Sequence, residues 1–233
     1  MSAGALVAAP LASFAQQPAK ASRVGVLATL SASVFASRVD ALRGGLRDLG
    51  YVEGRNIVIE PRSAEKFDRM PELAAELVSL KVDIIVAGGT PAIRAARQAS
   101  EAMPIVIAAV GDAVAGGLVA SLARPGGNTT GSTYFAPELA AKQLDLLKEA
   151  VPRIRRVAIL INPDNRATVP TYRAVEDAAG PLKLELERFE VRASGEFEGA
   201  FASMAKGRID AVLIIDDPVT ISNPGAIAVF VSP

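Results

Sequence analysis

The side chains best suited to chemistry stand directly after five short apolar runs of the sequence. Gly, Thr, Asn and Asp predominate at these points, and the candidate ligand-binding residues are Thr29, Gly89, Thr90, Asp112, Asn162, Asn165 and Asp216. A carboxylate can accept charge-assisted hydrogen bonds from an ammonium group, and an asparagine can both donate and accept. These residue types suit the holding of a small polar molecule better than its cleavage.

The sequence Gly88-Gly89-Thr90-Pro91 stands between an apolar run and a helix-like stretch. Glycines let a ligand approach the backbone, and the free N–H groups of a helix N-terminus attract a carboxylate or phosphate. We expect Thr90 to cap this helix and Pro91 to be its first residue. The segment therefore predicts an anion-binding turn, and a tight turn without a ligand is the alternative.

Two acidic turns follow other apolar runs. Asp112 comes after residues 105–110, and Asp216 and Asp217 follow residues 211–215. These carboxylates could bind a ligand ammonium, and two adjacent acids could instead hold Mg²⁺. The magnesium alternative needs a matching Asp and Lys at other strand ends, and the sequence offers no convincing set. A helix-cap or loop role is the third possibility.

Two asparagines and a threonine occupy similar positions. Asn162 and Asn165 follow residues 157–161, and Thr29 follows residues 24–28. An asparagine can bind a carboxylate or an amine without adding charge. The alternatives are an Asx turn at the asparagines and an ordinary helix cap at Thr29.

The composition narrows the possible functions. The chain has 25 basic and 25 acidic residues, and 50% of its residues are apolar. Because no basic stripe occurs, nucleic acid is not an expected partner. The sequence contains no His and no Cys, which excludes thiol catalysis, Ser-His-Asp hydrolysis and zinc or haem sites built on those residues. Carboxylate and lysine chemistry remain open, and we expect no cofactor.

The first 21 residues differ from the rest of the chain. Residues 4–12 are apolar and uncharged, and Ser13 and Ala15 fit the small-x-small cleavage rule of an export signal. The positively charged start of such a signal is missing. We therefore expect residues 1–21 to be a signal-peptide remnant or a disordered tail. The expected location is the periplasm, with the protein soluble or loosely associated with the membrane.

Strand-like and helix-like segments alternate along the chain, which predicts an α/β fold with parallel sheets. The expected strands are residues 24–28, 56–60, 82–87, 105–110, 157–161, 184–191 and 211–215. The expected helices are residues 35–49, 70–80, a segment from 91, and 114–122, 137–150, 168–179 and 197–205. In open parallel sheets, ligands bind beyond the carboxyl ends of the strands. The candidate residues above lie at those ends.

The turn-rich segment 125–131 is the natural boundary between two lobes. We expect an N-terminal α/β lobe at residues 22–131, a crossover strand and helix at 132–152, and a C-terminal lobe at 153–233. The end of the chain offers one possible strand, residues 226–231, and no closing helix. The second lobe is therefore expected to be incomplete.

Several short motifs together resemble the bacterial ABC-transporter substrate-binding proteins, a family that includes tryptophan- and tyrosine-type binding proteins. The motifs are Leu49-Gly50-Tyr51-Val52-Glu53-Gly54-Arg55-Asn56, Val82-Asp83-Ile84-Ile85-Val86, Thr90-Pro91-Ala92, Pro104-Ile105-Val106, Leu122-Ala123-Arg124-Pro125-Gly126-Gly127-Asn128, Thr130-Gly131 and Asn162-Pro163. The resemblance extends over residues 23–217. It implies a type I periplasmic binding fold, in which two Rossmann-like lobes joined by crossing strands close on a small solute.

The sequence departs from this family in two places. Ala113 follows Asp112 where family members usually carry proline. The resemblance therefore does not define the geometry of this turn. Family members also continue further and complete the second lobe, so the resemblance implies a C-terminal truncation.

The expected function is that of a non-enzymatic receptor that delivers an amino acid or similar solute to the permease of an ABC importer. The helix start near Thr90 and the hydroxyl of Thr29 would hold the anionic end of the solute. Asp112 or Asp216 would hold an ammonium, and the two asparagines would close from the other lobe. The alternatives are a Mg-dependent carboxylate enzyme and a cytoplasmic sensor domain of the same fold. The sensor would need a DNA-binding segment, for which residues 1–21 are too short and uncharged.

Overall fold

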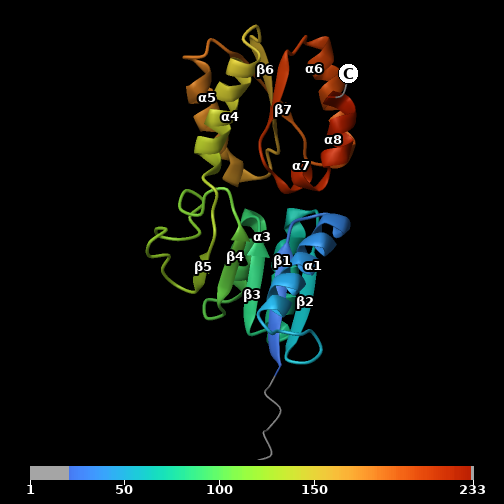
Figure 1. The fold of residues 1–233 in the computed structure, drawn as a ribbon, viewed down its shortest axis with the longest axis vertical. Coiled ribbons are helices and arrows are strands. Elements are labelled where there is room, and N and C mark those ends of the chain that lie inside the picture. Colours follow the sequence, from blue (N-terminus) through green and yellow to red (C-terminus); the bar gives the residue numbers. More distant parts are fainter. Residues whose placement is uncertain (1–20, 232–233) are drawn as a thin grey trace, which may run out of the picture.

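A computed structural model describes residues 21–231 of the chain, and the expected signal segment lies almost wholly outside them. The described chain forms two lobes, each built on its own sheet (Figure 1). The first sheet has the strand order β2-β1-β3-β4-β5 and the second the order β7-β6-β8. All named strand pairs are parallel. The predicted α/β class with two parallel sheets is confirmed.

The first lobe alternates strands with helices. Its strands are β1 (Ser22–Ala28), β2 (Ile57–Ser63), β3 (Ile84–Gly88), β4 (Ile105–Ala109) and β5 (Thr129–Gly131). Its helices are α1 (Ala32–Asp48), the short 3-10 helix Phe67–Arg69, α2 (Met70–Ser79) and α3 (Thr90–Ala99). Each predicted strand of this lobe is present with shifted ends.

Strand β1 shows how the sequence divides the first lobe's core. Successive side chains of a strand point to opposite faces. Val24 and Val26 pack with Phe35 of α1 on one face, whereas Leu27 packs with α2 and α3 on the other. Gly25 faces this second core closely, since a Cβ atom there would lie 3.1 Å from the side chain of Leu77. The continuous apolar run of β1 therefore supplies two cores at once.

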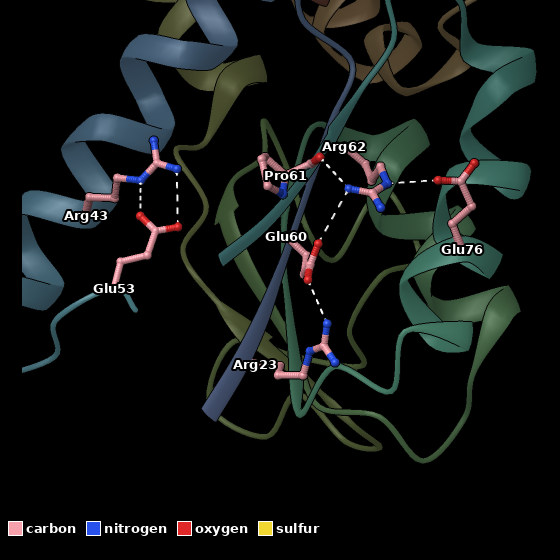
Figure 2. A network of polar contacts seen from close by, with 7 residues as sticks. All are labelled: Arg23, Arg43, Glu53, Glu60, Pro61, Arg62 and Glu76. Atoms are coloured by element: carbon pink, nitrogen blue, oxygen red, sulfur yellow. Dashed lines mark hydrogen bonds and ion pairs between the residues drawn. The ribbon is translucent and has the colours of Figure 1, made fainter. Parts of the chain in front are cut away.

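Charged side chains line β2, the outer strand of the first sheet (Figure 2). Glu60 is paired with Arg23 of β1 at 2.8 Å and with Arg62 at 3.9 Å. Arg62 also donates a 2.8 Å hydrogen bond to Glu76 of α2. Charges at an outer strand discourage it from pairing with another chain. This network thus protects an edge that a parallel sheet leaves open.

The second lobe places helices on both faces of a smaller sheet. Its strands are β6 (Arg156–Ile161), β7 (Glu185–Glu190) and β8 (Ala211–Ile214). Its helices are α4 (Ala136–Ala150), α5 (Val169–Ala179), α6 (Phe197–Lys206), α7 (Pro218–Ser222) and α8 (Pro224–Val231), with short 3-10 helices at Arg166–Thr168 and Ser194–Glu196. Residues of α4 and α5 share one apolar cluster with β6, and residues of α6 and α8 share the other.

The segment after β5 carries the chain from the first lobe into α4. Its backbone follows the end of β4 and the residues beyond it: Tyr134 N donates to Val110 O at 3.1 Å, and Ala136 N donates to Gly111 O at 2.9 Å. Phe135 lies between them with a φ of 33°, a left-handed conformation, and is the N-cap of α4. The crossing segment is therefore fixed against the first sheet up to the first residue of α4. Residues 132–135 form no strand.

The predicted strand 226–231 is wrong, because this segment belongs to helix α8. Ile227 is buried against α6, and the ring of Phe230 stacks on Phe201 of α6 at a centroid distance of 5.2 Å. These two contacts are three residues apart, a spacing that shares one helix face but not one strand face. A short apolar run does not distinguish the two conformations.

One further prediction of local structure is wrong, and one strand was not predicted. Residues 114–122 form turns and bends instead of a helix, and Gly117 has a φ of 66°. Arg94 and Arg97 of α3 donate to the carbonyl oxygens of Gly116 and Gly117, at 3.0 and 2.9 Å. The turn-rich segment 125–131, in turn, ends in strand β5, which pairs with β4.

Helix α3 and helix α1 differ from expectation at one residue each. The N-cap of α3 is Gly89, with a φ of 83°, and Thr90 is the first residue of the helix. No side chain caps this helix start. Leu49, the last residue expected in this first helix, is instead the C-cap of α1 and is 75% exposed. Within residues 21–231, no helix combines the length and the apolar character needed to cross a bilayer.

Candidate functional site

A cavity of about 610 Å³ lies between the two lobes, at the carboxyl ends of both sheets. Thr29 and Gly89 line it from the first lobe, and Asn165 and Asp216 line it from the second. The volume falls within the range of about 300–1,000 Å³ that is usual for small-molecule sites. The topology therefore brings together strand ends that are far apart in the sequence.

The structure places the sequence-predicted residues unequally. Those that line the cavity are Thr29, Gly89, Thr90, Asp112, Asn165 and Asp216. Asn162 does not line it: its side chain is buried, with 2% exposure, and donates a hydrogen bond to Asp217. The expected cluster thus forms, apart from Asn162, which lies behind the cavity wall.

The first lobe offers a hydroxyl group and a helix start to the cavity. The Oγ1 atom of Thr29 is buried and has no hydrogen-bond partner among the described residues. Gly89 lies against it, since a Cβ atom on Gly89 would lie 3.1 Å from that oxygen. No side chain caps α3, which begins at the next residue, Thr90. An unpartnered donor beside a helix N-terminus suits the binding of an anionic group.

Asp216 offers a carboxylate from the second lobe. It follows β8, and no hydrogen bond to it is found within the described part of the chain. Partial desolvation raises the pKa of Asp216 above the ordinary aspartate value. Burial, followed by the charge of Asp216, also raises the pKa of the Tyr134 phenol, which lines the same cavity. Both side chains thus border the cavity, Asp216 from the end of β8 and Tyr134 from the crossing segment.

Asp112 is partly occupied by its own loop. Its Oδ1 atom accepts hydrogen bonds from the backbone N–H groups of Val114 and Ala115, both at 2.9 Å. Asp112 therefore has the loop role that the sequence left as one of three possibilities. One carboxylate oxygen is engaged, so Asp112 is a weaker candidate than Asp216 for an ammonium.

The two asparagines hold a buried carboxylate. Asn162 and Asn165 donate to the two oxygens of Asp217, at 3.0 and 2.9 Å, and Val219 N donates to Oδ1 at 2.9 Å. Asp217 is only 1% exposed. Burial raises its pKa, and the three hydrogen bonds lower it to a smaller extent. The network connects the loop after β6 to the end of β8 and the start of α7.

The asparagine oxygens are also engaged locally. Asn162 Oδ1 accepts from Asp164 N at 3.0 Å, and Asn165 Oδ1 accepts from Ala167 N at 3.2 Å. These are the Asx-type contacts that the sequence left as the alternative. Both side chains therefore position the second lobe's strand ends, and of the two only Asn165 also borders the cavity.

Several cavity residues were not found from the sequence. Arg38 of α1, Gln143 of α4 and the phenol of Tyr134 line the cavity together with apolar side chains such as Phe35 and Leu139. Arg38 is exposed and has no acidic partner among residues 21–231. Their positions on helices and on the crossing segment carry no local signal, because only tertiary packing decides which helix side chains border the cleft beyond the strand ends.

The neighbouring acids Asp216 and Asp217 do not converge on one point. Asp216 lines the open cavity, whereas Asp217 also borders it but is buried and bonded to amides. Within the described ranges, no group of three or more acidic side chains is arranged to hold a metal ion. The two acids therefore have separate roles: Asp216 faces the cavity, and Asp217 holds the strand ends of the second lobe together.

The chain matches known proteins over most of its described length. The sequence profile of ABC transporter substrate binding proteins covers residues 23–230. A tyrosine-binding protein of Clostridioides difficile (strain R20291) is 32% identical over 182 residues, which are 76% of this chain and 51% of that protein. The chain thus spans about half the length of this relative.

Solved structures share the fold. A conserved domain protein from Vibrio cholerae is 25% identical, with a TM-score of 0.81 over 92% of this chain and 73% of its own. An ABC domain from Streptococcus pneumonia in complex with L-Trp is 23% identical, with a TM-score of 0.80 over 91% and 70% of the two chains. A leucine-binding protein from Thermotoga maritima is 14% identical, with a TM-score of 0.63 over 83% and 55%.

Proposed function

The chain belongs to the ABC transporter substrate-binding protein family, and from this premise we propose that it captures a small solute between its lobes for an ABC importer. The fold is the type I periplasmic binding fold. One observation carries the proposal: the cavity is lined by the strand ends of both sheets. A solute that contacts both lobes stabilises the arrangement in which they are close together, because only that arrangement completes the contacts.

An amino acid with an apolar or aromatic side chain is the proposed solute. The relative from Clostridioides difficile is named a tyrosine-binding protein, and the structure from Streptococcus pneumonia contains L-Trp. The cavity combines a free carboxylate at Asp216, a cation at Arg38 and an apolar wall that includes Phe35. Such a lining matches a molecule with two opposite charges and an apolar body.

The proposed roles follow the two sides of the cavity. Thr29 and the start of α3, at Gly89 and Thr90, receive the carboxylate of the solute. Asp216 receives its ammonium group through a charge-assisted hydrogen bond. Asn165 and Asp112 border the solute, and Asn162 acts behind them through Asp217. In this proposal the protein binds and releases the solute unchanged, so it performs no reaction.

The remaining parts of the proposal concern the whole protein. We place the lobes at residues 22–131 and 153–233, joined by residues 132–152, of which α4 packs on the second lobe. The proposed location is the periplasm, and the proposed partner is the permease of the importer in the inner membrane. Both follow from the transport role of the family.

A thermal-shift screen of the twenty amino acids tests the function. A ligand at about one hundred times its dissociation constant adds about 2.7 kcal/mol of stability. For a chain of this size the melting temperature should rise by about 5–10 °C. We expect an apolar or aromatic amino acid to produce this rise. A cooperative melt that no amino acid shifts would refute the proposed solute class.

The same assay separates the receptor from the magnesium-dependent alternative. Binding that relies on Asp216 and a helix start needs no divalent ion, so the shift should be the same with and without EDTA. A shift that disappears with EDTA and returns with Mg²⁺ would favour a metal-dependent site instead.

A further inference from the structure

Helix α7 of the second lobe contacts the first lobe directly. The backbone N–H of Ser31, just before α1, donates a 3.0 Å hydrogen bond to Ser222 Oγ at the end of α7. The two residues are 191 positions apart in the sequence and the contact is partly buried. This hydrogen bond therefore depends on the distance between the lobes.

The same helix forms a wall of the cavity. Pro218 and Ile221 of α7 line it opposite Thr29 and Gly89. A side chain on Gly89 would come within 3.9 Å of Pro218 Cγ, which shows how closely α7 approaches the first lobe. The element that closes the gap between the lobes is thus also an element that a bound solute would touch.

Helix α7 is held firmly by its own lobe. Asp217 is its N-cap and forms a capping box with Thr220, in which Asp217 Oδ1 accepts from Val219 N and Thr220 Oγ1 accepts from Asp217 N. The Asp217 carboxylate is in turn held by Asn162 and Asn165. Because these contacts lie within the second lobe, α7 should move with that lobe as one body.

Unpartnered polar atoms on the first lobe lie next to this contact. Thr29 Oγ1 and Ser31 Oγ are both buried and without a hydrogen-bond partner among the described residues. Thr29 lines the cavity, and Ser31 lies two positions further along the same turn. A solute that orders this turn at Thr29 would also order the donor that meets Ser222.

We propose that α7 is an interlobe latch, in which the hydrogen bond from Ser31 N–H to Ser222 Oγ stabilises the closed arrangement around the cavity. The role of the latch in holding a solute rests on the proposed function. The hydrogen bond between the lobes does not depend on that proposal. A single hydrogen bond of this kind changes an equilibrium by about twofold to tenfold. The latch is therefore weak enough to open for release.

A cysteine pair tests the contact without any solute. The chain has no Cys, so S31C/S222C would carry the only two thiols. We expect mild oxidation to form an intramolecular disulfide, measured by mass and by non-reducing electrophoresis. The control pair S37C/S203C uses exposed serines on α1 and α6, and it should not cross-link. Equal cross-linking of the two pairs, or none in either, overturns the latch.

Spin labels attached to the S37C/S203C pair measure the equilibrium between the open and closed arrangements of the lobes. With labels at positions 37 and 203, S222A should raise the ratio of long to short interlobe distances by about twofold to tenfold. The matched variant S79A removes a hydroxyl that bonds only within α2, and it should leave the distances unchanged. Identical distance distributions for S222A and S79A overturn the proposal.

L-Tyrosine and L-tryptophan as probes keep the two proposals apart. If the S31C/S222C pair cross-links and neither probe shifts the melting temperature, the latch stands and the proposed solute loses support. If a probe binds and S222A leaves the distances between the spin labels unchanged, the binding function stands and the latch is wrong. The oxidised S31C/S222C protein should also exchange a bound probe at least tenfold more slowly than its reduced form.

Discussion

At the scale of single residues, Asp216 and Asp217 show how neighbours acquire different tasks. Successive side chains of an extended chain point in opposite directions, and Asp217 has an extended backbone, with φ −148° and ψ 151°. Asp217 is consequently surrounded by the amides of Asn162 and Asn165, whereas Asp216 faces the cavity without a hydrogen-bond partner in the described residues. Only Asp216 keeps its charge available for a solute.

The affinity for an amino acid should depend on pH through Asp216. Desolvation raises the pKa of Asp216, and only its ionised form attracts an ammonium group. Affinity should therefore be full at neutral pH and fall as the pH is lowered through a pKa above the ordinary aspartate value. Calorimetric titration of the amino acid found in the thermal screen, between pH 4 and 8, measures this.

Variants at two aspartates provide the control for this titration. D216N should weaken binding by about tenfold to one hundredfold, because it removes a hydrogen bond to a charged group. Its affinity should also vary less with pH than that of the unaltered protein, in which Asp216 and the neighbouring Asp217 both have a raised pKa. D68N alters an exposed acid outside the cavity and should behave as the unaltered protein. Burial raises the pKa of Tyr134, so its phenol stays protonated throughout this range. A pH dependence that is unchanged in D216N would contradict the assignment.

At the scale of elements, strand β5 can pair with β4 only because residue 131 is a glycine. Gly131 has a φ of 141°, and a Cβ atom there would lie 2.2 Å from Ile107 O. G131A should therefore lower the free energy of unfolding by more than about 1 kcal/mol, since the alanine meets both backbone strain and a backbone atom. Urea unfolding measures the change.

Gly199 offers the matched control for Gly131. It lies in helix α6 at an exposed position, and a Cβ atom there would meet no atom within 4 Å. G199A should raise the free energy of unfolding by about 0.5–1 kcal/mol, because alanine loses less backbone freedom in a helix. If both alanine variants changed stability in the same direction, the strain argument for β5 would fail.

At the scale of the whole molecule, the cavity forms where the crossing segment brings the carboxyl ends of the two sheets together. A solute held by Thr29 and Asp216 should slow amide hydrogen exchange in both lobes together. We expect protection at residues 29–31 and 216–222 on addition of the stabilising amino acid, measured by exchange mass spectrometry. Residues 52–56, which do not line the cavity, should be unaffected. Protection confined to one lobe would contradict closure around the solute.

Much of this architecture followed from sequence patterns. The continuous apolar runs of β1, β3, β4, β6 and β8 predicted buried parallel strands. Their carboxyl ends predicted where Thr29, Gly89, Asp112, Asn165 and Asp216 would meet. These predictions were possible because strand burial and turn chemistry are local properties of the chain. The helix over residues 224–231 was missed, because only its packing against Phe201 distinguishes it from a strand.

The sequence by itself determined the α/β class, the strand ends that border the cavity and the absence of Cys and His chemistry. The tertiary structure alone decided which polar groups remain free. Asn162 and Asn165 are engaged by Asp217, Asp112 by its own loop, and Ser222 by Ser31 of the other lobe, while Asp216 and Thr29 keep no partner in the described part. The physical reason is that hydrogen-bond satisfaction depends on distances between segments remote in sequence, which residue types and spacing do not specify.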